Sequence, residues 1–246
     1  MVNPSRPASP LAKRLPPGRP GAVPVMRANA LPPPPPAGRA YGGLSPQDRA
    51  AARRDRLVAA ATTLFGSQGL HATTVRGVCN AAGLTDRYFY ESFTSLEALL
   101  AAVYLRLLGQ LRAALQQAAS ALATSTSASA EARFTAGYGA WFDFVSDPGH
   151  ARILLAEVLG VSPAVDALYE AGMAEFAAAL AAPLAELGTS PERCALIGRA
   201  LVGAVVQVAK MWSSSGYQAP RDAVVRSCVL VAVGTVQALR QEGVGR

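Results

Sequence analysis

The sequence feature that most restricts the fold is residues 73–93, TTVRGVCNAAGLTDRYFYESF. Apolar residues recur at helical spacing on both sides of Gly83, which predicts two short helices joined by a tight turn. Glycine adopts the left-handed backbone that such a turn needs without steric cost. The second helix is dense in polar and aromatic side chains, and a short helix that aims polar groups outward suits the major groove of DNA.

Helices are predicted on both sides of this segment as well. Ser45-Pro46 has the form of an N-cap followed by proline at the first helical position. Candidate N-caps of the next three helices are Thr73 or Thr74, then Thr85, then Thr94 in a capping box with Glu97. After a Ser/Thr/Ala linker near residues 124–130 the pattern stays helical, with prolines near four helix starts, at Pro148, Pro163, Pro191 and Pro220. About nine helices and no convincing strand are expected, so the fold class is all-α.

The positive charge of the chain is concentrated in its N-terminal third. The formal net charge is +7 and the pI is near 9.8. Residues 1–45 carry +6 without any acidic side chain, residues 46–96 carry +2, and residues 97–246 carry −1. An excess of this kind favours an anionic partner such as nucleic acid or an acidic membrane surface.

The cysteines and the apolar runs indicate the cellular compartment in which the chain is expected to work. Cys79, Cys194 and Cys228 are few, odd in number and widely spaced, so a reducing cytoplasm is expected rather than a disulfide framework. Cys194 and Cys228 are interpreted as buried apolar residues, the alternative being redox sensors. No run of about 18 uninterrupted apolar residues occurs, so neither a transmembrane helix nor a membrane partner is expected.

Residues 1–44 are rich in proline, with a run at Pro32–Pro36, and poor in large apolar residues. Such a segment buries too little surface to offset chain entropy, so a disordered basic tail is predicted. Two interpretations stay open. The tail is either an arm that touches DNA phosphates or a dispensable extension in front of a true start at Met26.

Residues 53–104 resemble the N-terminal DNA-binding domain of the TetR family of transcriptional regulators. An isolated A-G-L-T would be a weak signal, whereas a whole series of motifs in the family's order and spacing is specific. The matching positions are Arg56-Leu57-Val58-Ala59-Ala60-Ala61, Leu64-Phe65, Gly69, Thr73-Thr74-Val75-Arg76, Ala82-Gly83-Leu84-Thr85, Phe89-Tyr90, Phe93, Ser95, Glu97, Ala98 and Leu99. The resemblance implies a helix-turn-helix domain over residues 45–94 and a helical ligand-binding and dimerisation domain over residues 95–246.

The resemblance also implies roles at the DNA. Thr74 and Arg76 would meet phosphate or a base edge, and Tyr90 would donate its hydroxyl to a phosphate. The residues implied to face the bases from the recognition helix are Thr85, Asp86, Arg87 and Tyr88. Backbone N–H groups at a helix N-terminus favour anions, and arginine can pair with guanine in a bidentate contact.

Some positions depart from the family's pattern, which often has a basic residue at Asp86, small residues at Arg87 and Tyr88, and lysine at Leu96. Asp86 either accepts from cytosine or is an acid of the cap region without a role at DNA. We hypothesise that the basic tail supplies the phosphate contact that Leu96 cannot make, in which case deleting residues 1–40 weakens DNA binding and its salt dependence. Glu91 and Ser92 are interpreted as solvent-facing.

In this family the remaining helices bind a ligand and dimerise. Aromatic and methionine side chains on several predicted helices suit a pocket for a mainly apolar or planar ligand, the alternative being that they only fill the core. The candidates are Tyr104, Tyr138, Trp141, Phe142, Val145, Tyr169, Met173, Phe176, Gln207 and Met211. Polar groups suited to orient a ligand are Asp143, His150, Arg152, Glu157 and Gln207. Neither histidine has a partner at metal-ligand spacing, so no metal or cofactor is expected.

The last two predicted helices, roughly residues 191–212 and 221–240, are long and rich in small residues. Their faces allow close helix packing and are too apolar to leave exposed. A two-fold homodimer through a four-helix bundle is expected, the alternative being burial within one subunit.

Together these features predict a ligand-responsive regulator. It is expected to repress by holding a palindromic operator as a dimer, and to leave the DNA when a small, mainly apolar ligand binds. Two alternatives are a constitutive architectural DNA-binding protein and an all-helical enzyme. Against the enzyme, the sequence shows no nucleophile–base set, no metal cluster and no phosphate-cradling glycine loop.

Overall fold

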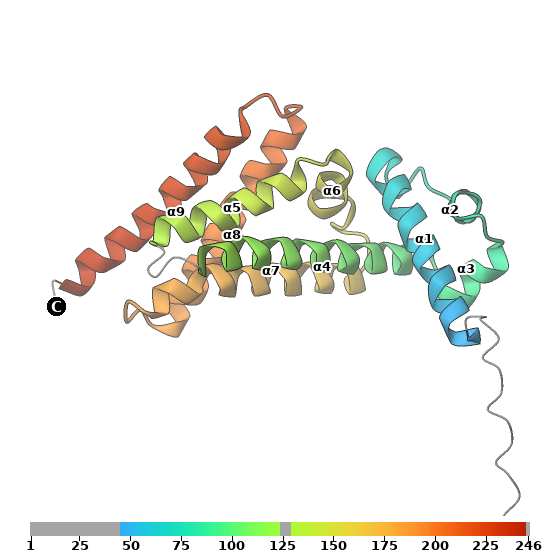
Figure 1. The fold of residues 1–246 in the computed structure, drawn as a ribbon, viewed down its shortest axis with the longest axis horizontal. Helices are drawn as coiled ribbons and strands as arrows, with labels where there is room; N and C mark the ends of the chain where they lie inside the picture. The colour runs from blue at the N-terminus through green and yellow to red at the C-terminus, as the bar shows by residue number, and fades with distance from the viewer. Residues whose placement is uncertain (1–44, 124–128, 245–246) are drawn as a thin grey trace, which may run out of the picture. The chain divides into compact units, whose positions relative to one another are not determined.

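The computed structural model describes residues 45–123 and 129–244, and every regular element in these ranges is a helix (Figure 1). The first four are α1 (Pro46–Gln68), α2 (Val75–Ala82), α3 (Asp86–Ser92) and α4 (Leu96–Ala123). They are followed by α5 (Ala130–Val145), α6 (Pro148–Arg152), the π-helical turn η1 (Ile153–Glu157), α7 (Pro163–Ala185), α8 (Pro191–Ser214) and α9 (Arg221–Val244). The prediction of an all-α fold with about nine helices is confirmed for this part of the chain. The basic tail and most of the predicted linker lie outside the described residues.

Most helices begin where the sequence signals place them. The hydroxyl of Ser45 accepts from the backbone N–H of Asp48 at 3.0 Å while the Asp48 carboxylate accepts from the N–H of Ser45, a complete capping box at α1. Serine or aspartate caps followed by proline start α6, α7 and α8. The capping box predicted for α4 is wrong in detail, because Ser95 rather than Thr94 accepts from the first turn, at 3.1 Å from the N–H of Ala98.

The helices fall into a small N-terminal group and a larger group built on α4 (Figure 1). α1, α2 and α3 pack on one another beside the start of α4. α4 runs parallel to α7, since the rings of Tyr104 and Tyr169 lie 6.5 Å apart and, farther along, Arg112 pairs with Glu175 at 2.6 Å. α8 packs along α7, and α5 lies between α4 and α9. We refer to α1–α3 as the head and to α4–α9 as the body.

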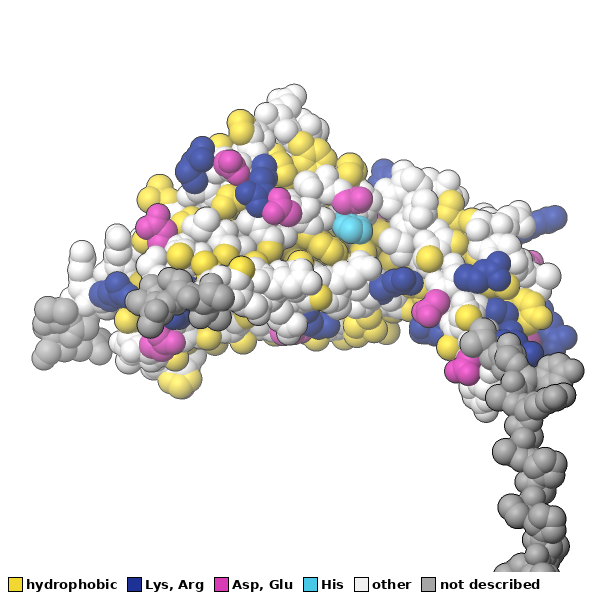
Figure 2. Space-filling view, in the orientation of Figure 1, with side chains coloured by type: hydrophobic (Ala, Val, Ile, Leu, Met, Phe, Trp, Pro, Cys, Tyr) yellow, Lys and Arg dark blue, Asp and Glu magenta, His cyan; other side chains and the backbone are white. Residues whose placement is uncertain are grey.

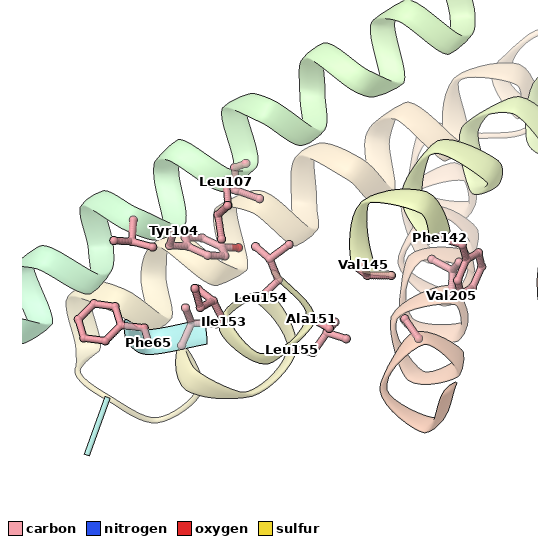
Figure 3. Packing of buried hydrophobic residues seen from close by; sticks show 14 of the residues in the cluster. Phe65, Tyr104, Leu107, Phe142, Val145, Ala151, Ile153, Leu154, Leu155 and Val205 are labelled. Carbon is pink, nitrogen blue, oxygen red and sulfur yellow. The ribbon is translucent and has the colours of Figure 1, made fainter. Parts of the chain in front are cut away.

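The hydrophobic core is continuous from the head into the body. Phe89 fills the centre of the head with no exposed surface. Phe65, near the end of α1, lies beside Ile153 of η1 and close to Tyr104 of α4 (Figure 3). The two groups of helices are therefore joined by packed apolar side chains as well as by the chain.

Glycines allow backbones to approach closely at two helix contacts. A Cβ atom on Gly66 of α1 would lie 2.7 Å from the Cα of Gly149 in α6. A Cβ atom on Gly198 of α8 would overlap the carbonyl oxygen of Ala177 in α7. Real Cβ atoms do not come this near to backbone, so both contacts depend on glycine.

Three of the described helical stretches reach the length and hydropathy of membrane-spanning segments, by length and composition only: Leu96–Leu122, Pro191–Ser214 and Arg221–Glu242. This corrects the expectation drawn from uninterrupted apolar runs, because scattered small and charged residues break the runs without lowering the mean hydropathy. Between 33% and 39% of an 18-residue window in each stretch is buried, so each helix gives one face to the core and leaves another uncovered.

Candidate nucleic-acid interface and ligand cavity

The turn between α2 and α3 is fixed by local polar contacts. Thr74 caps α2 by accepting from the N–H of Gly77 at 3.1 Å. Gly83 follows α2 with φ 62° and ψ 41°, the left-handed conformation predicted for it. Arg56 reaches over from α1 and donates to the carbonyls of Ala82 and Gly83, which the last turn of α2 would otherwise leave unpaired.

The recognition helix α3 buries one side and presents the other. Phe89 is fully buried and its ring meets those of Tyr90 and Phe93 at centroid distances of 5.3 Å and 6.0 Å. Tyr90 is 62% exposed. Thr85 is the N-cap residue of α3, as predicted, although its side chain makes no capping hydrogen bond. The predicted DNA-facing residues that are exposed are Thr74, Arg76, Thr85, Asp86, Arg87 and Tyr90.

Tyr88 differs from the other predicted contacts. It is half-buried, and the guanidinium of Arg53 lies 4.5 Å from its ring centroid. Glu91, interpreted from sequence as solvent-facing, accepts from Arg87 at 2.9 Å and lies 3.9 Å from Arg53. The four-residue spacing of Arg87 and Glu91 on a helix was the signal that could have revealed this pair.

Positive side chains accumulate on the head. Within the described residues, α1 carries four arginines, and α2 and α3 carry one each. In Figure 2 these dark blue side chains cluster on the head.

Burial raises the pKa of the Cys79 thiol, and the Asp86 carboxylate raises it further, so Cys79 stays a neutral core residue of the turn.

The body encloses a cavity of about 630 Å³ between α4, α5, α7, α8 and η1. Six predicted residues line it: Tyr104, Tyr138, Trp141, Tyr169, Met173 and Phe176. The indole Nε1 of Trp141 is buried without a hydrogen-bond partner in the described chain. Burial raises the pKa of Tyr138, which keeps its hydroxyl neutral.

Four predicted residues do not line the cavity. Phe142 and Val145 are fully buried on another face of α5, where Phe142 packs edge-on against Trp212 and the Val145 carbonyl accepts from the hydroxyl of Tyr217 at 3.1 Å. Gln207 is exposed, and Met211 is 64% exposed. Both lie on a side of α8 away from Val202, Val205 and Val206, which do line the cavity. Apolar character alone did not distinguish the faces of these helices.

The polar candidates other than Gln207 hold the fold together. Asp143 accepts twice from Arg221, each time at 2.6 Å. His150 stacks on Phe144 with the ring centroids 4.5 Å apart. The charged residues at the cavity are instead Arg133 and Glu186, which sequence reasoning missed because neither has a distinctive spacing.

The cavity has one closed and one open end. Its lining on α4 extends from Tyr104 to Leu122, roughly 27 Å at the rise of an α-helix. At the first end Tyr104, Leu154 and Leu155 are buried. At the other end Arg133 and Glu186 are exposed to solvent. A long ligand with an apolar body and a polar head group fits this polarity.

The η1 turn touches both the cavity and the head. Leu154 and Leu155 line the cavity. On either side of them, Arg152 donates to the carbonyl of Ser67 and the Glu157 carboxylate accepts from the N–H of Leu70 at 2.7 Å. Arg152 and Glu157, predicted as ligand contacts, therefore connect the body to the last turn of α1 and to the loop that follows it.

Comparisons with known proteins match the head and, at lower identity, most of the chain. The sequence profile of the family described as "Bacterial regulatory proteins, tetR family" matches residues 57–103. The HTH-type transcriptional repressor KstR2 of Mycolicibacterium smegmatis is 42% identical over 50 residues, which are 20% of this chain and 24% of KstR2. The HTH-type transcriptional activator FasR of the same organism is 27% identical over 202 residues, 81% of this chain and 89% of FasR. The chain thus spans about a quarter of KstR2 but most of FasR.

Solved structures share the fold. The fatty acid degradation regulator FadR from Bacillus halodurans superposes with a TM-score of 0.61 at 16% identity, covering 78% of this chain and 97% of its own. FadR from Bacillus subtilis, solved in complex with stearoyl-CoA, also has a TM-score of 0.61 at 16% identity, covering 73% and 97%. At these identities the likeness establishes the fold alone.

Proposed function

Because the chain belongs to the TetR family of DNA-binding transcriptional regulators, we propose that it represses transcription from a palindromic operator as a homodimer and is released by a long, mainly apolar effector. The observation that carries this proposal is that one helix, α4, connects the DNA-binding head to the cavity of the body. It begins beside the recognition helix, and it lines the cavity from Tyr104 to Leu122. We place the regulator in the cytoplasm.

The proposed DNA contacts are made by the start of α2 and the N-terminal end of α3. Thr74 and Arg76 are exposed at the first, and Thr85, Asp86 and Arg87 at the second. Tyr90 presents its hydroxyl from the next turn of α3 and is the proposed phosphate contact. Tyr88 acts indirectly in this proposal, since its ring supports Arg53.

The proposed dimer interface is the uncovered face of α8 and α9. Leu196 on α8 is 72% exposed, and Leu230 and Val231 on α9 are 74% and 55% exposed. Large apolar side chains gathered on two neighbouring helices mark a protein–protein surface. A second copy that packs the same pair of helices against them forms an isologous four-helix interface, which places two recognition helices for one palindrome.

The proposed effector is a fatty-acyl compound. Support comes from the length and apolar lining of the cavity, from the charged residues at its open end, and from the stearoyl-CoA bound by a protein of the same fold. The acyl chain lies along α4 toward Tyr104, and the polar head group stays near Arg133 and Glu186.

Release of DNA follows from the position of η1. A ligand shifts an equilibrium only if it binds one state more tightly. A chain that fills the closed end presses on Leu154 and Leu155 of η1. The head is held at either end of this turn, by Arg152 at the end of α6 and by Glu157 of η1. In the proposed mechanism the ligand favours a position of η1 that moves the head out of register with the operator.

The test is a mobility-shift assay with the full chain and the DNA that flanks its gene. Arg76→Ala should weaken binding and reduce the salt slope by about one, because the variant cannot neutralise one of the phosphates. Arg106→Ala, which removes an exposed arginine from α4, should change neither. Failure to retard this DNA or a pool of genomic fragments would refute the proposal.

The same DNA is used to test which compound is the effector and whether the protein represses or activates transcription. Octadecanoyl-CoA should release the protein and raise transcription in vitro. Retention at saturating octadecanoyl-CoA and other acyl-CoA lengths would favour a constitutive architectural protein. A fall in transcription on release would instead show activation, the role described for FasR, whereas KstR2 is described as a repressor.

A further inference from the structure

Two tyrosines stand at the closed end of the cavity. Tyr104 of α4 is 3% exposed, and its ring lies 6.5 Å from that of Tyr169 of α7. Both residues line the cavity, together with the apolar side chains of Leu108, Leu154 and Leu155. The closed end thus combines an apolar wall with two phenol groups.

The two hydroxyls are neutral and have no protein partner in the described chain. Burial raises the pKa of Tyr104 to about 12 and also raises the pKa of Tyr169, so each hydroxyl can both donate and accept at neutral pH. The nearby charged groups are engaged elsewhere. Arg112 pairs with Glu175 at 2.6 Å, and Glu170 with Arg199 at 3.0 Å.

Gly172 leaves room for the Tyr104 hydroxyl. A Cβ atom at this position of α7 would lie 3.0 Å from the hydroxyl oxygen, closer than most such contacts. The glycine therefore fits a hydroxyl that occupies this spot, where phenylalanine at position 104 would fill most of the same volume without a polar atom.

A purely hydrocarbon ligand does not suit such an end. When an alkyl terminus fills the cavity, it excludes water from the hydroxyls and offers them no hydrogen bond. A buried hydroxyl left unpaired in this way opposes binding, whereas a ligand oxygen at the same place satisfies it. The chemistry of the closed end is that of a site for a hydroxyl or carbonyl group.

We propose that Tyr104 and Tyr169 select an acyl effector whose buried terminus carries an oxygen atom, as a hydroxyl or a carbonyl. The inference rests on the proposed function, since it assumes that an acyl chain lies along α4 with its far end at Tyr104. It adds a discrimination between effectors of equal length. Both tyrosine hydroxyls can donate to a terminal carbonyl, whereas with a terminal hydroxyl one donates to its oxygen and the other accepts its proton. Gly172 leaves the Tyr104 hydroxyl the room that it needs.

The experiment compares octadecanoyl-CoA with 18-hydroxyoctadecanoyl-CoA on the full chain by calorimetric titration. The wild type should bind the hydroxylated probe about tenfold more tightly, which is the effect of satisfying a buried polar group instead of leaving it unpaired. Tyr104→Phe combined with Tyr169→Phe should remove this preference, mainly by tightening binding of the plain chain. Thermal melting verifies that the variants fold.

Tyr138→Phe is the matched control, because Tyr138 lines the cavity from α5 rather than at the closed end. It should change the affinity of both probes by the same factor. Equal binding of the two probes by the wild type, or a preference that survives the double substitution, overturns the selection while leaving the acyl effector intact. Binding of neither probe overturns the acyl effector itself, and the selection with it.

Discussion

The head and the body are stabilised in different ways. The head is small, and its geometry depends on individual polar contacts such as the Thr74 cap, the left-handed Gly83 and the Arg56 bonds to two carbonyls. The body consists of long helices packed through apolar faces around a cavity of about 630 Å³. Local contacts fix the head to one shape, as reading DNA requires, while the body keeps space inside that a ligand can fill.

The contrast also concerns where each part is sensitive to change. In the head, a single polar substitution is expected to disturb the turn. In the body, many apolar exchanges around the cavity should be tolerated, because the cavity can absorb changes of volume. The exceptions in the body are positions where backbones touch, and at the junction the sensitive positions are those where η1 holds the head.

The largest effect is expected at the contact between α7 and α8. Gly198→Ala places a methyl group against the carbonyl of Ala177, so the two helices must separate. We expect a loss of about 2 to 3 kcal/mol in the free energy of unfolding, the cost typical of overpacking a core. Urea denaturation followed by circular dichroism measures it.

Gly109→Ala in α4 is the matched control. No atom lies within 4 Å of a Cβ at this position, so the substitution should be neutral or stabilising, by up to about 1 kcal/mol from helix propensity. Equal destabilisation by both substitutions would show that the body is sensitive to helix composition in general and not to this contact.

The second prediction concerns the junction. Glu157→Gln replaces the charge-assisted bond to the Leu70 N–H, which measures 2.7 Å, by a weaker neutral one. The attachment of the head to η1 should weaken by about 1 to 2 kcal/mol, within the range for hydrogen bonds to charged groups. DNA should still bind, but effector should release it less completely, and the Leu70 amide should exchange hydrogen faster.

The comparison variant is Glu175→Gln, which affects a half-exposed ion pair with Arg112 within the body. Such surface pairs contribute less than about 1 kcal/mol, and the effector response should stay at its wild-type level. If effector released the Glu157→Gln variant from DNA as completely as the wild type, η1 would not transmit the effector signal to the head.

How far the sequence predicted these features depends on the range of the interaction. The caps at Ser45 and Thr74 and the turn at Gly83 were predicted because each is encoded within a few residues. The bond between Glu157 and Leu70 spans 87 residues and leaves no local pattern. Six of the ten candidate ligand contacts line the cavity. Phe142 and Met211 lie elsewhere, because aromatic and methionine side chains suit a core, a surface and a pocket alike.

The third prediction is a dependence of stability on alkaline pH that belongs to the body. The pKa of Tyr104 is about 12 in the folded protein against 10.0 for an ordinary tyrosine. Its stabilising contribution is therefore complete below pH 10 and is lost as pH rises toward 12, because the unfolded chain releases the proton first. By pH 11, one unit above the ordinary pKa, the loss is on the order of 1 kcal/mol.

Urea denaturation at pH 8 and pH 11, with the wild type and Tyr104→Phe, tests this dependence. The variant should lose less stability between the two pH values than the wild type, by on the order of 1 kcal/mol. An identical pH dependence of the two proteins would mean that Tyr104 ionises as easily in the folded chain as in the unfolded one.

The smallest effect is expected in the head, from Arg56→Met. The methionine keeps the aliphatic bulk but cannot donate to the carbonyls of Ala82 and Gly83. Because Arg56 is exposed and water can replace part of these bonds, the loss of stability should be about 1 kcal/mol. The effect on function should exceed this, since the substitution loosens the turn that orients α3, so operator affinity should fall more than stability does.

The control variant Arg54→Met distinguishes the effect of loosening the turn from the effect of losing one positive charge. Arg54 lies on α1, as Arg56 does, but it points away from the turn. Its guanidinium lies 4.7 Å from the ring centroid of Phe93. Both variants lose one charge, so both should weaken DNA binding through the general electrostatic attraction. Only Arg56→Met should also reduce the discrimination between operator and random DNA, which a mobility-shift competition measures. If both variants lost discrimination equally, the precision of the head would depend on its charge rather than on the polar contacts that fix its turn.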